Sequence, residues 1–585
     1  MSGARSASML GLAGMMALSE PPSPMAATAV RDGTPTPAAC EALGYPVPVE
    51  NSRSSIAVRG SLARPAAPFA PVPNIPPLPV PPVAKRMEEA RPAPPAPPPR
   101  PTVIVGGAQQ RLDTERYPGA QANPIKQVAE EPVSTFSVDV DTASYANVRR
   151  FLSDGARPPA NAVRVEELVN YFDYGYRRPA SRNEPFATYA AVFPSPWAKE
   201  RQIIHIGLQG YDLPRQTQPP LNLVFLVDTS GSMWGQDRLP LATKALNLLV
   251  DQLRPQDRVA IVAYAGSAGA VLAPTDGRSK LKVRCALGAL RAGGSTAGGE
   301  GLALAYDLAK QNLDPKAINR VILMTDGDFN VGVADPARLK DLVSDQRKSG
   351  VYLSVYGFGR GNYNDVTMQT LAQNGNGTAA YVDSLNEARK LFRDDFSSSL
   401  FPIANDVKIQ VEFNPAQVSE YRLIGYETRM LAREDFNNDQ VDAGEVGAKA
   451  SVTALYEITP VGARASIDPL RYGASPQPRA GSSELAYLKV RYKLPGQTAS
   501  HLMQRPIGQA DAYPSLQMAP EASRWAVAVA GFGQLLKRDP RIEPGFGWPQ
   551  VIDLAQGARG VDPFGLRAEF VQLARAAEET APKGD

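Results

Sequence analysis

The sequence has few of the residues from which most enzyme sites are built. Its two histidines, His205 and His501, nearly exclude histidine-ligated zinc and a Ser-His hydrolase. Its two cysteines, Cys40 and Cys285, exclude a disulfide framework or a cysteine-based zinc site within one chain, and permit a single bridge. No Walker A pattern is present, and the run 293–297 lacks the final glycine of a nucleophile elbow. The sequence therefore argues against an enzyme.

Charge and hydrophobic runs exclude further classes. The formal net charge is +3, and no basic stripe marks a nucleic-acid surface. No stretch is apolar and long enough to cross a bilayer as a helix. A chain of 585 residues is too long for one hydrophobic core and predicts several domains.

Residues 1–110 are rich in proline and alanine, as in the runs 76–82 and 92–99. Such a segment buries too little apolar surface to offset the entropy lost on ordering, so we expect a disordered, stiff spacer. The alternative is a ligand for a proline-binding module.

The first forty residues leave the compartment open. Arg5 precedes an apolar run at 9–18, and small residues follow at 27–29, so this stretch resembles a poor secretory signal. A disordered tail or a misplaced start codon is the alternative. Ala38-Ala39-Cys40 is faintly similar to a lipidation site, although no apolar run directly precedes it.

Four ordered segments follow. Segment 123–215 begins with a strand pattern at 136–141, continues with two helical patterns, and ends near a strand at 203–208. Strands and helices alternate in 220–400, which predicts an α/β domain with a doubly wound, mainly parallel sheet. In segment 401–510, apolar and polar residues alternate as in antiparallel strands with one solvent-exposed face. Segment 515–580 is helical in pattern.

Oxygen-bearing side chains follow two strands of the α/β segment. The stretch 228–232 (DTSGS) follows the apolar run 223–227, and Asp326 follows the apolar run 321–325. Between them, the glycine-rich loop 293–299 carries Thr296 just ahead of a helical pattern. Ligands of open α/β sheets bind at the carboxyl ends of the strands, and hard oxygen donors there suit Mg²⁺ or Ca²⁺.

This set of donors resembles the metal-ion-dependent adhesion site of the von Willebrand factor type A (VWA) family. From about Asn123 onward, the chain resembles a bacterial subfamily with an extra N-terminal segment and a β-rich C-terminal region. The resemblance implies that an ion, Mg²⁺ or else Ca²⁺ or Mn²⁺, is bound by hydroxyls and by carboxylates acting largely through water. An acidic group from a partner protein would complete the coordination. The implied site residues are Asp228, Ser230, Ser232, Thr296 and Asp326.

Other acidic residues receive less specific interpretations. Asp328 is expected to lie at the rim of the site or to cap the next segment, with a role as a metal ligand as the alternative. Asp139 and Asp141 are expected to cap the following helix, and the alternative is that they bind a metal. The stretch 435–445 begins like a calcium loop, but it lacks the glycine and the glutamate that such a loop needs at its sixth and twelfth positions. An acidic turn is therefore expected there, with cation binding as the alternative.

The leading hypothesis is a metal-dependent adhesion or scaffold protein of the periplasm or cell envelope. A cytoplasmic assembly partner for an ATPase is the first alternative, and a metal-dependent hydrolase is the second. Trp234, just past the stretch 228–232 that carries Ser230 and Ser232 (the serine loop), either forms an apolar rim or packs against the sheet. The partner, the preferred ion and the oligomeric state stay open.

Overall fold

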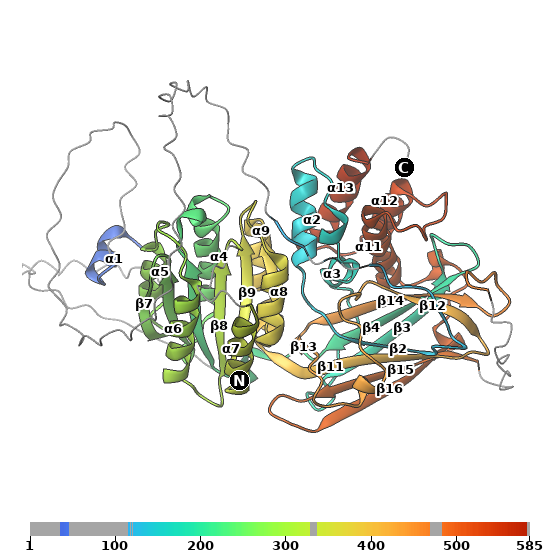
Figure 1. Ribbon diagram of the computed structural model, residues 1–585, viewed down its shortest axis with the longest axis horizontal. Helices are drawn as coiled ribbons and strands as arrows, with labels where there is room; N and C mark the ends of the chain where they lie inside the picture. Colours follow the sequence, from blue (N-terminus) through green and yellow to red (C-terminus); the bar gives the residue numbers. More distant parts are fainter. Residues whose placement is uncertain are drawn as a thin grey trace, which may run out of the picture.

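The computed structural model describes residues 35–45, 115–117, 119, 121–327, 336–468 and 483–581. The apolar run 9–18, most of the proline-rich segment and Asp328 lie outside these residues. An α/β domain forms one end of the molecule, and a β-sandwich with helices on one face forms the other (Figure 1).

The α/β domain has a six-stranded sheet in the order β10-β9-β8-β5-β6-β7. Five strands are parallel, and β7 is antiparallel to its neighbour β6. This confirms the predicted doubly wound fold. The strands are β5 Leu221–Asp228, β6 Arg258–Tyr264, β7 Ala268–Asp276, β8 Ile318–Thr325, β9 Val351–Phe358 and β10 Ala379–Val382.

Helices cover both faces of this sheet. On central strand β5, Phe225 belongs to the same buried apolar cluster as residues of α4, α5 and α9, whereas Leu226 belongs to a second cluster with residues of α6, α7 and α8. Every residue of β5 is therefore buried, which explains why its sequence is a continuous apolar run. The helices are α4 Leu239–Gln252, α5 Lys280–Gly288, α6 Gly298–Gln311, α7 Pro336–Lys348, α8 Asp365–Asn374, α9 Leu385–Arg389 and α10 Phe396–Leu400, with a π turn at Lys390–Asp394.

Edge strand β7 is absent from the sequence prediction. Four of its nine residues are alanine or glycine, and it includes Pro274, residues that disfavour strands in general. Proline is tolerated at a sheet edge because one side of the strand has no ladder to complete. Pairing with β6 therefore decides the conformation of this segment, rather than its own propensity.

The sandwich has two sheets, and each draws strands from both sides of the α/β domain in the sequence. One sheet has the order β1-β12-β14-β4-β3, and in the other β2 and β15 both pair with β11. Segments 123–215 and 401–510 thus share both sheets, with the α/β domain inserted between β4 and β11. The strands are β1 Lys126–Gln127, β2 Val133–Ser137, β3 Phe186–Pro194, β4 Gln202–Gly210, β11 Pro402–Phe413, β12 Val418–Ile424, β13 Gly444–Gly447, β14 Ser451–Pro460, β15 Glu484–Lys493 and β16 Ser500–Gly508.

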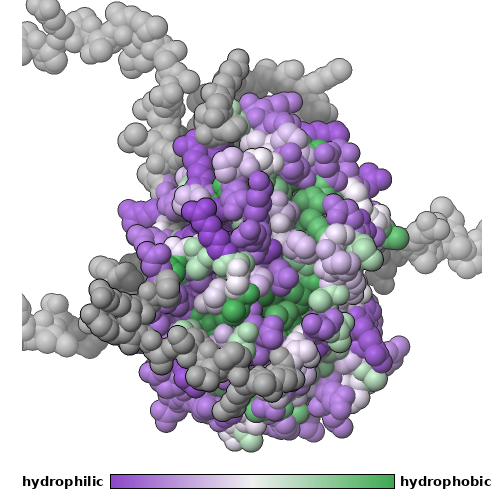
Figure 2. Space-filling view, turned by 90° about the vertical axis from the view of Figure 1, so that its right-hand side faces the viewer, coloured by the Kyte–Doolittle hydropathy of each residue, from purple (hydrophilic) through white to green (hydrophobic). Residues whose placement is uncertain are grey.

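A helical layer covers the outer face of the β4 sheet. Ile204 and Ile206 point between the two sheets, whereas Ile203 packs toward the helices, so β4 is buried on both faces. Figure 2 views this end of the molecule, where apolar residues gather near the middle of a mostly hydrophilic face. The helices are α2 Ala143–Ser153, α3 Val165–Asn170, α11 Glu521–Lys537, α12 Trp548–Gly557 and α13 Leu566–Glu579.

The expected helix-capping role of Asp139 and Asp141 is wrong. The first turn of α2 is instead capped from outside, because the Ser144 amide donates to Glu167 Oε2 at 2.7 Å. Asp139 pairs with Arg429 at 2.8 Å, and Asp141 Oδ1 accepts the Ala379 amide of β10 at 2.9 Å. Tertiary partners have thus taken both carboxylates, and Asp141 connects the segment after β2 with the α/β sheet.

The loop that resembles a calcium site binds a lysine. Lys408 Nζ donates to the carbonyl oxygens of Asp435 at 2.9 Å and Asn438 at 2.6 Å. Lys408 is only 1% exposed. The side chain of Asp439 accepts from Arg491 Nη2 at 3.0 Å. The loop is a turn, as expected, and an internal ammonium group occupies its carbonyl oxygens.

Candidate metal site

The end of β5 holds a fixed carboxylate. Asp228 is fully buried, and its Oδ1 accepts the Ser230 amide at 2.8 Å. Its Oδ2 accepts hydroxyl groups from Tyr264 at 3.1 Å and Thr325 at 3.2 Å. Burial is the largest influence and raises the pKa of Asp228 to about 6, although the hydrogen bonds from Ser230 act in the opposite direction. The carboxylate is thus oriented by two neighbouring strands.

Two hydroxyls lie beside this carboxylate. Ser230 Oγ and Ser232 Oγ are 2.9 Å apart. Adjacent ligands of an octahedral Mg²⁺, each about 2.1 Å from the ion, lie roughly 3 Å from one another. The two serine hydroxyls are hydrogen-bonded to one another, and their spacing is also compatible with adjacent ligands of one small cation.

The loop that carries Thr296 is held against the serine loop by the backbone. The Gly231 amide donates to the Gly294 carbonyl at 2.9 Å, and the Gly293 amide donates to the Thr229 carbonyl at 2.8 Å. Gly294 has a φ of +85°, a left-handed conformation that glycine adopts without strain. Thr296 itself is half-buried, just before α6 begins.

Asp326 follows β8 and is fully buried. The next residue, Gly327, has a φ of +100°, and an added Cβ would lie 2.6 Å from the Asn362 carbonyl oxygen. Only glycine therefore allows the chain to leave β8 so close to the loop after β9. This turn fixes Asp326 at the same sheet edge as Asp228.

The sequence interpretation missed Arg238. Its Nη1 donates to Asp326 Oδ2 at 2.8 Å, and its guanidinium also donates to the carbonyl oxygens of Ser232 and Arg360. Arg238 is 5% exposed and precedes the first residue of α4. A cation at the positive end of a helix dipole is unfavourable without a nearby anion. An arginine directly before a predicted helix could therefore have indicated a nearby carboxylate.

Known protein families match three consecutive parts of the chain. The family described as von Willebrand factor matches residues 111–205, the von Willebrand factor type A domain matches 222–394, and "Uncharacterized protein YfbK, C-terminal" matches 398–580. "Uncharacterized protein YfbK" of Escherichia coli K12 is 46% identical over 475 residues, covering 80% of this chain and 81% of its own. The chain belongs to the YfbK family of VWA-domain proteins.

Two further similarities cover less or are more distant. "Uncharacterized protein sll0103" of Synechocystis is 31% identical over 179 residues, which are 30% of this chain and 41% of that one. A solved von Willebrand factor type A structure from Catenulispora acidiphila superimposes with a TM-score of 0.40 at 16% identity, covering 69% of this chain and 91% of its own. The YfbK match, which spans all three parts, confirms the resemblance to a bacterial VWA subfamily.

In this YfbK-family chain, Trp234 forms the outer end of the serine loop. It ends the short 3-10 turn η3, Gly231–Trp234, and is 77% exposed. The alternative, packing against the sheet, is therefore wrong. A large aromatic surface lies two residues from Ser232.

Histidine, cysteine and acidic side chains form no metal-binding group of their own among the described residues. Among them, no three His, Cys, Asp or Glu side chains are grouped in a way that could hold a metal ion. His205 does lie 2.9 Å from Ser523 Oγ, but both residues are fully buried, and its other ring nitrogen contacts Tyr176 at 2.7 Å. Burial lowers the pKa of His205 to about 3. A substrate cannot reach this pair, so it is a structural contact.

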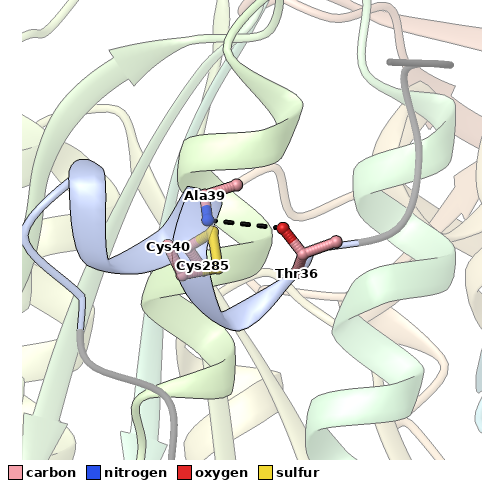
Figure 3. Close-up of a disulfide and its surroundings, with 4 residues drawn as sticks. All are labelled: Thr36, Ala39, Cys40 and Cys285. Atoms are coloured by element: carbon pink, nitrogen blue, oxygen red, sulfur yellow. Dashed lines mark hydrogen bonds between the residues drawn. A yellow bond between two sulfur atoms is a disulfide. The ribbon is translucent and has the colours of Figure 1, made fainter. Parts of the chain in front are cut away.

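A disulfide joins Cys40 to Cys285, with 5.2 Å between their Cα atoms (Figure 3). It fixes the short helix α1, Pro37–Ala42, to α5. The single bridge that the sequence permitted is therefore formed. Because the Cys40 sulfur is bonded to Cys285, it is not a free thiol for a lipid, and the resemblance to a lipidation site is overturned. No helix of the described part of the chain is long and apolar enough to span a membrane.

Proposed function

We propose that the protein is a metal-ion-dependent protein-binding module, and not an enzyme. The ion is Mg²⁺, with Ca²⁺ or Mn²⁺ as alternatives, held by Asp228, Ser230, Ser232, Thr296 and Asp326. The observation that carries this proposal is the 2.9 Å spacing of the Ser230 and Ser232 hydroxyls at an edge with two buried carboxylates. When bound, the ion supplies an electrophilic position for an external carboxylate.

The side chains of the site support this role through their charges. Ser230 and Ser232 are neutral, so they bind a cation without cancelling its charge. Asp228 accepts the Ser230 amide and thereby orients the serine loop, as residues behind the direct ligands do in other metal sites. Trp234 adds an exposed aromatic surface beside this loop. The expected partner is a protein that presents an acidic residue next to an apolar one.

Metal binding is tested by titration calorimetry of the full chain with Mg²⁺. We expect Asp228→Ala to weaken binding at least tenfold, because the carboxylate that orients the serine loop is lost. The matched control is Asp345→Ala, since Asp345 also lies in this domain but its side chain is 68% exposed and pairs with Lys348 on the surface. Equal affinity in the wild type and Asp228→Ala would contradict the site assignment.

Partner binding is tested by capture from a lysate in Mg²⁺ and in chelator. We expect the chelator to release the partner without changing the circular dichroism of the protein. A partner that stays bound in chelator would show that recognition is independent of the ion, and that another surface carries it.

For the compartment, we propose the periplasm or cell envelope. The support is the Cys40–Cys285 disulfide, because disulfides persist mainly in oxidising compartments. Cell fractionation combined with thiol alkylation before lysis provides the test. A cytoplasmic protein with both thiols alkylated would contradict this location and favour the assembly partner of an ATPase.

A further inference from the structure

The guanidinium of Arg238 lies inside the candidate site. It contacts Asp326 at 2.8 Å, and both side chains are almost completely buried. The absence of a side chain at Gly359 leaves room for the Arg238 side chain, because an added Cβ there would lie 2.3 Å from Arg238 Nε. Gly359 also has a φ of +75°. Arg238 is therefore a fixed part of the site.

This guanidinium changes the charge that a metal ion would meet. Asp228 and Asp326 together contribute a formal charge of about two negative units, whereas the hydroxyl ligands contribute none. Two carboxylates alone would neutralise a divalent cation. With Arg238 ion-paired to Asp326, one unit of positive charge stays uncompensated when the cation is bound.

We propose that Arg238 is a specificity-determining residue that reduces the affinity of the site for the metal ion and raises its affinity for a carboxylate. This rests on the proposed function. The uncompensated charge repels the cation but attracts an incoming anion, because both interactions are Coulombic and occur in a poorly hydrated site. An acidic partner then restores neutrality.

A structural role alone predicts a different result. Arg238 also bonds the carbonyl oxygens of Ser232 and Arg360, so it connects the serine loop with the loop after β9. If that connection were its whole contribution, its loss would loosen the ligands and weaken both metal and carboxylate binding. The sign of the change in metal affinity separates the two roles.

The first measurement is calorimetric titration of Mg²⁺ into full-length variants. We expect Arg238→Gln to bind Mg²⁺ on the order of tenfold more tightly than the wild type, and Arg238→Lys to stay within about twofold. Arg360→Gln is the matched control, because that side chain is 57% exposed and pairs with Asp154. It is expected to leave Mg²⁺ affinity unchanged. Equal or weaker Mg²⁺ binding by folded Arg238→Gln would overturn the proposal.

The second measurement uses acetate as the carboxylate. The apparent Mg²⁺ affinity is measured at rising acetate concentration against chloride of equal ionic strength, because coupling between two ligands is reciprocal. We expect acetate to strengthen Mg²⁺ binding by the wild type, and to do so several-fold less in Arg238→Gln. The same acetate effect in both proteins would overturn the proposal.

A third comparison remains decisive if Arg238→Gln folds poorly. Asp326→Asn leaves Arg238 without its recorded carboxylate partner and should weaken Mg²⁺ binding, whereas adding Arg238→Gln restores the original formal charge. We expect the double variant to recover part of the lost affinity, and no recovery would overturn the proposal. Wild-type protein that binds no Mg²⁺ at all would refute the proposed function itself, whereas Mg²⁺ binding with the wrong sign in the variants would refute only the role of Arg238.

Discussion

The α/β domain and the sandwich are built from the chain in opposite ways. The α/β sheet takes its strands from one continuous stretch, Leu221 to Val382. In the sandwich, Ile206 pairs with Ala454 and Phe136 pairs with Ile409, across the whole inserted domain. Pairing of such distant segments must overcome a larger loop-closure entropy. The sandwich therefore depends on contacts that no local segment contains.

Buried charge is also used differently in the two regions. At the edge of the α/β sheet, Asp228 accepts one amide and two hydroxyl groups, whereas Asp326 is paired with Arg238. At the junction with the sandwich, buried carboxylates are neutralised by arginines, as in the pairs of Arg164 with Asp365 and of Arg149 with Glu387. The arginines at the junction thus link two regions of the molecule, whereas Arg238 links loops within the α/β domain.

The largest expected effect is at this junction. Arg164→Met removes the partner of Glu167 and Asp365, both fully buried, and should cost about 3–5 kcal/mol of unfolding free energy because two carboxylates lose their counterion. Urea unfolding measures it. The control is Arg178→Met, whose pair with Asp212 at 3.2 Å is largely exposed, with an expected cost below about 1 kcal/mol. Equal losses of unfolding free energy in the two variants would mean that the buried ion pairs of the junction contribute no more than an exposed pair.

The next largest expected effect is a loss of stability of the α/β domain as the pH rises. The pKa of Asp228 is about 6 in the folded protein and 3.8 ordinarily, so the folded state holds an extra proton between these values. Its contribution to stability is present below pH 3.8 and is lost as the pH rises through 6, a change of about 3 kcal/mol. Urea unfolding in chelator measures this loss, and Asp228→Asn should remove it. A wild-type slope that Asp228→Asn retains would assign it to another group.

The disulfide is expected to stabilise the α/β domain and not the sandwich. Replacing Cys40 and Cys285 by serine should cost the α/β domain about 2–4 kcal/mol, because the cross-link closes a long loop in the unfolded chain. The six-residue helix α1 is too short to persist alone and should become protease-sensitive. Calorimetric unfolding and limited proteolysis measure the two effects. Continued protection of residues 35–45 would show that packing, rather than the bond, holds this segment.

His205 should give the sandwich the opposite pH dependence. Its pKa is about 3 when folded and 6.5 ordinarily, so the unfolded state binds more protons between these values. Its contribution is complete above pH 6.5 and is lost as the pH falls toward 3, at about 1.4 kcal/mol per pH unit, or about 2 kcal/mol at pH 5. Hydrogen exchange of β4 amides at several pH values measures it. A His205→Gln variant with the same acid sensitivity would exclude this residue as the cause.

The smallest expected effect on stability is at the rim of the site. Trp234→Ala should change the unfolding free energy by less than about 0.5 kcal/mol, because its side chain is 77% exposed. It should nevertheless weaken binding of a captured partner several-fold. Surface plasmon resonance with that partner compares the wild type with Trp234→Ala, and unchanged binding would remove Trp234 from the interface.

The sequence alone determined the α/β domain and the order of its candidate ligands. Buried parallel strands are short apolar runs, and residues placed directly after them must meet at one edge of the sheet. Asp228 and Asp326 could therefore be assigned to one place without coordinates. Strand β7 was not predicted, because its pairing with β6 outweighs the low strand propensity of its residues.

Only the tertiary structure decided which groups meet across long distances. Local patterns describe what a segment can do by itself, whereas a charged or sulfur-bearing side chain is satisfied by whichever partner the folded chain brings near. Arg238 therefore lies against Asp326, Asp139 against Arg429, and Cys40 against Cys285, although no local pattern pairs them. The same reason applies to the sandwich, whose sheets exist only after two segments on either side of the α/β domain have come together.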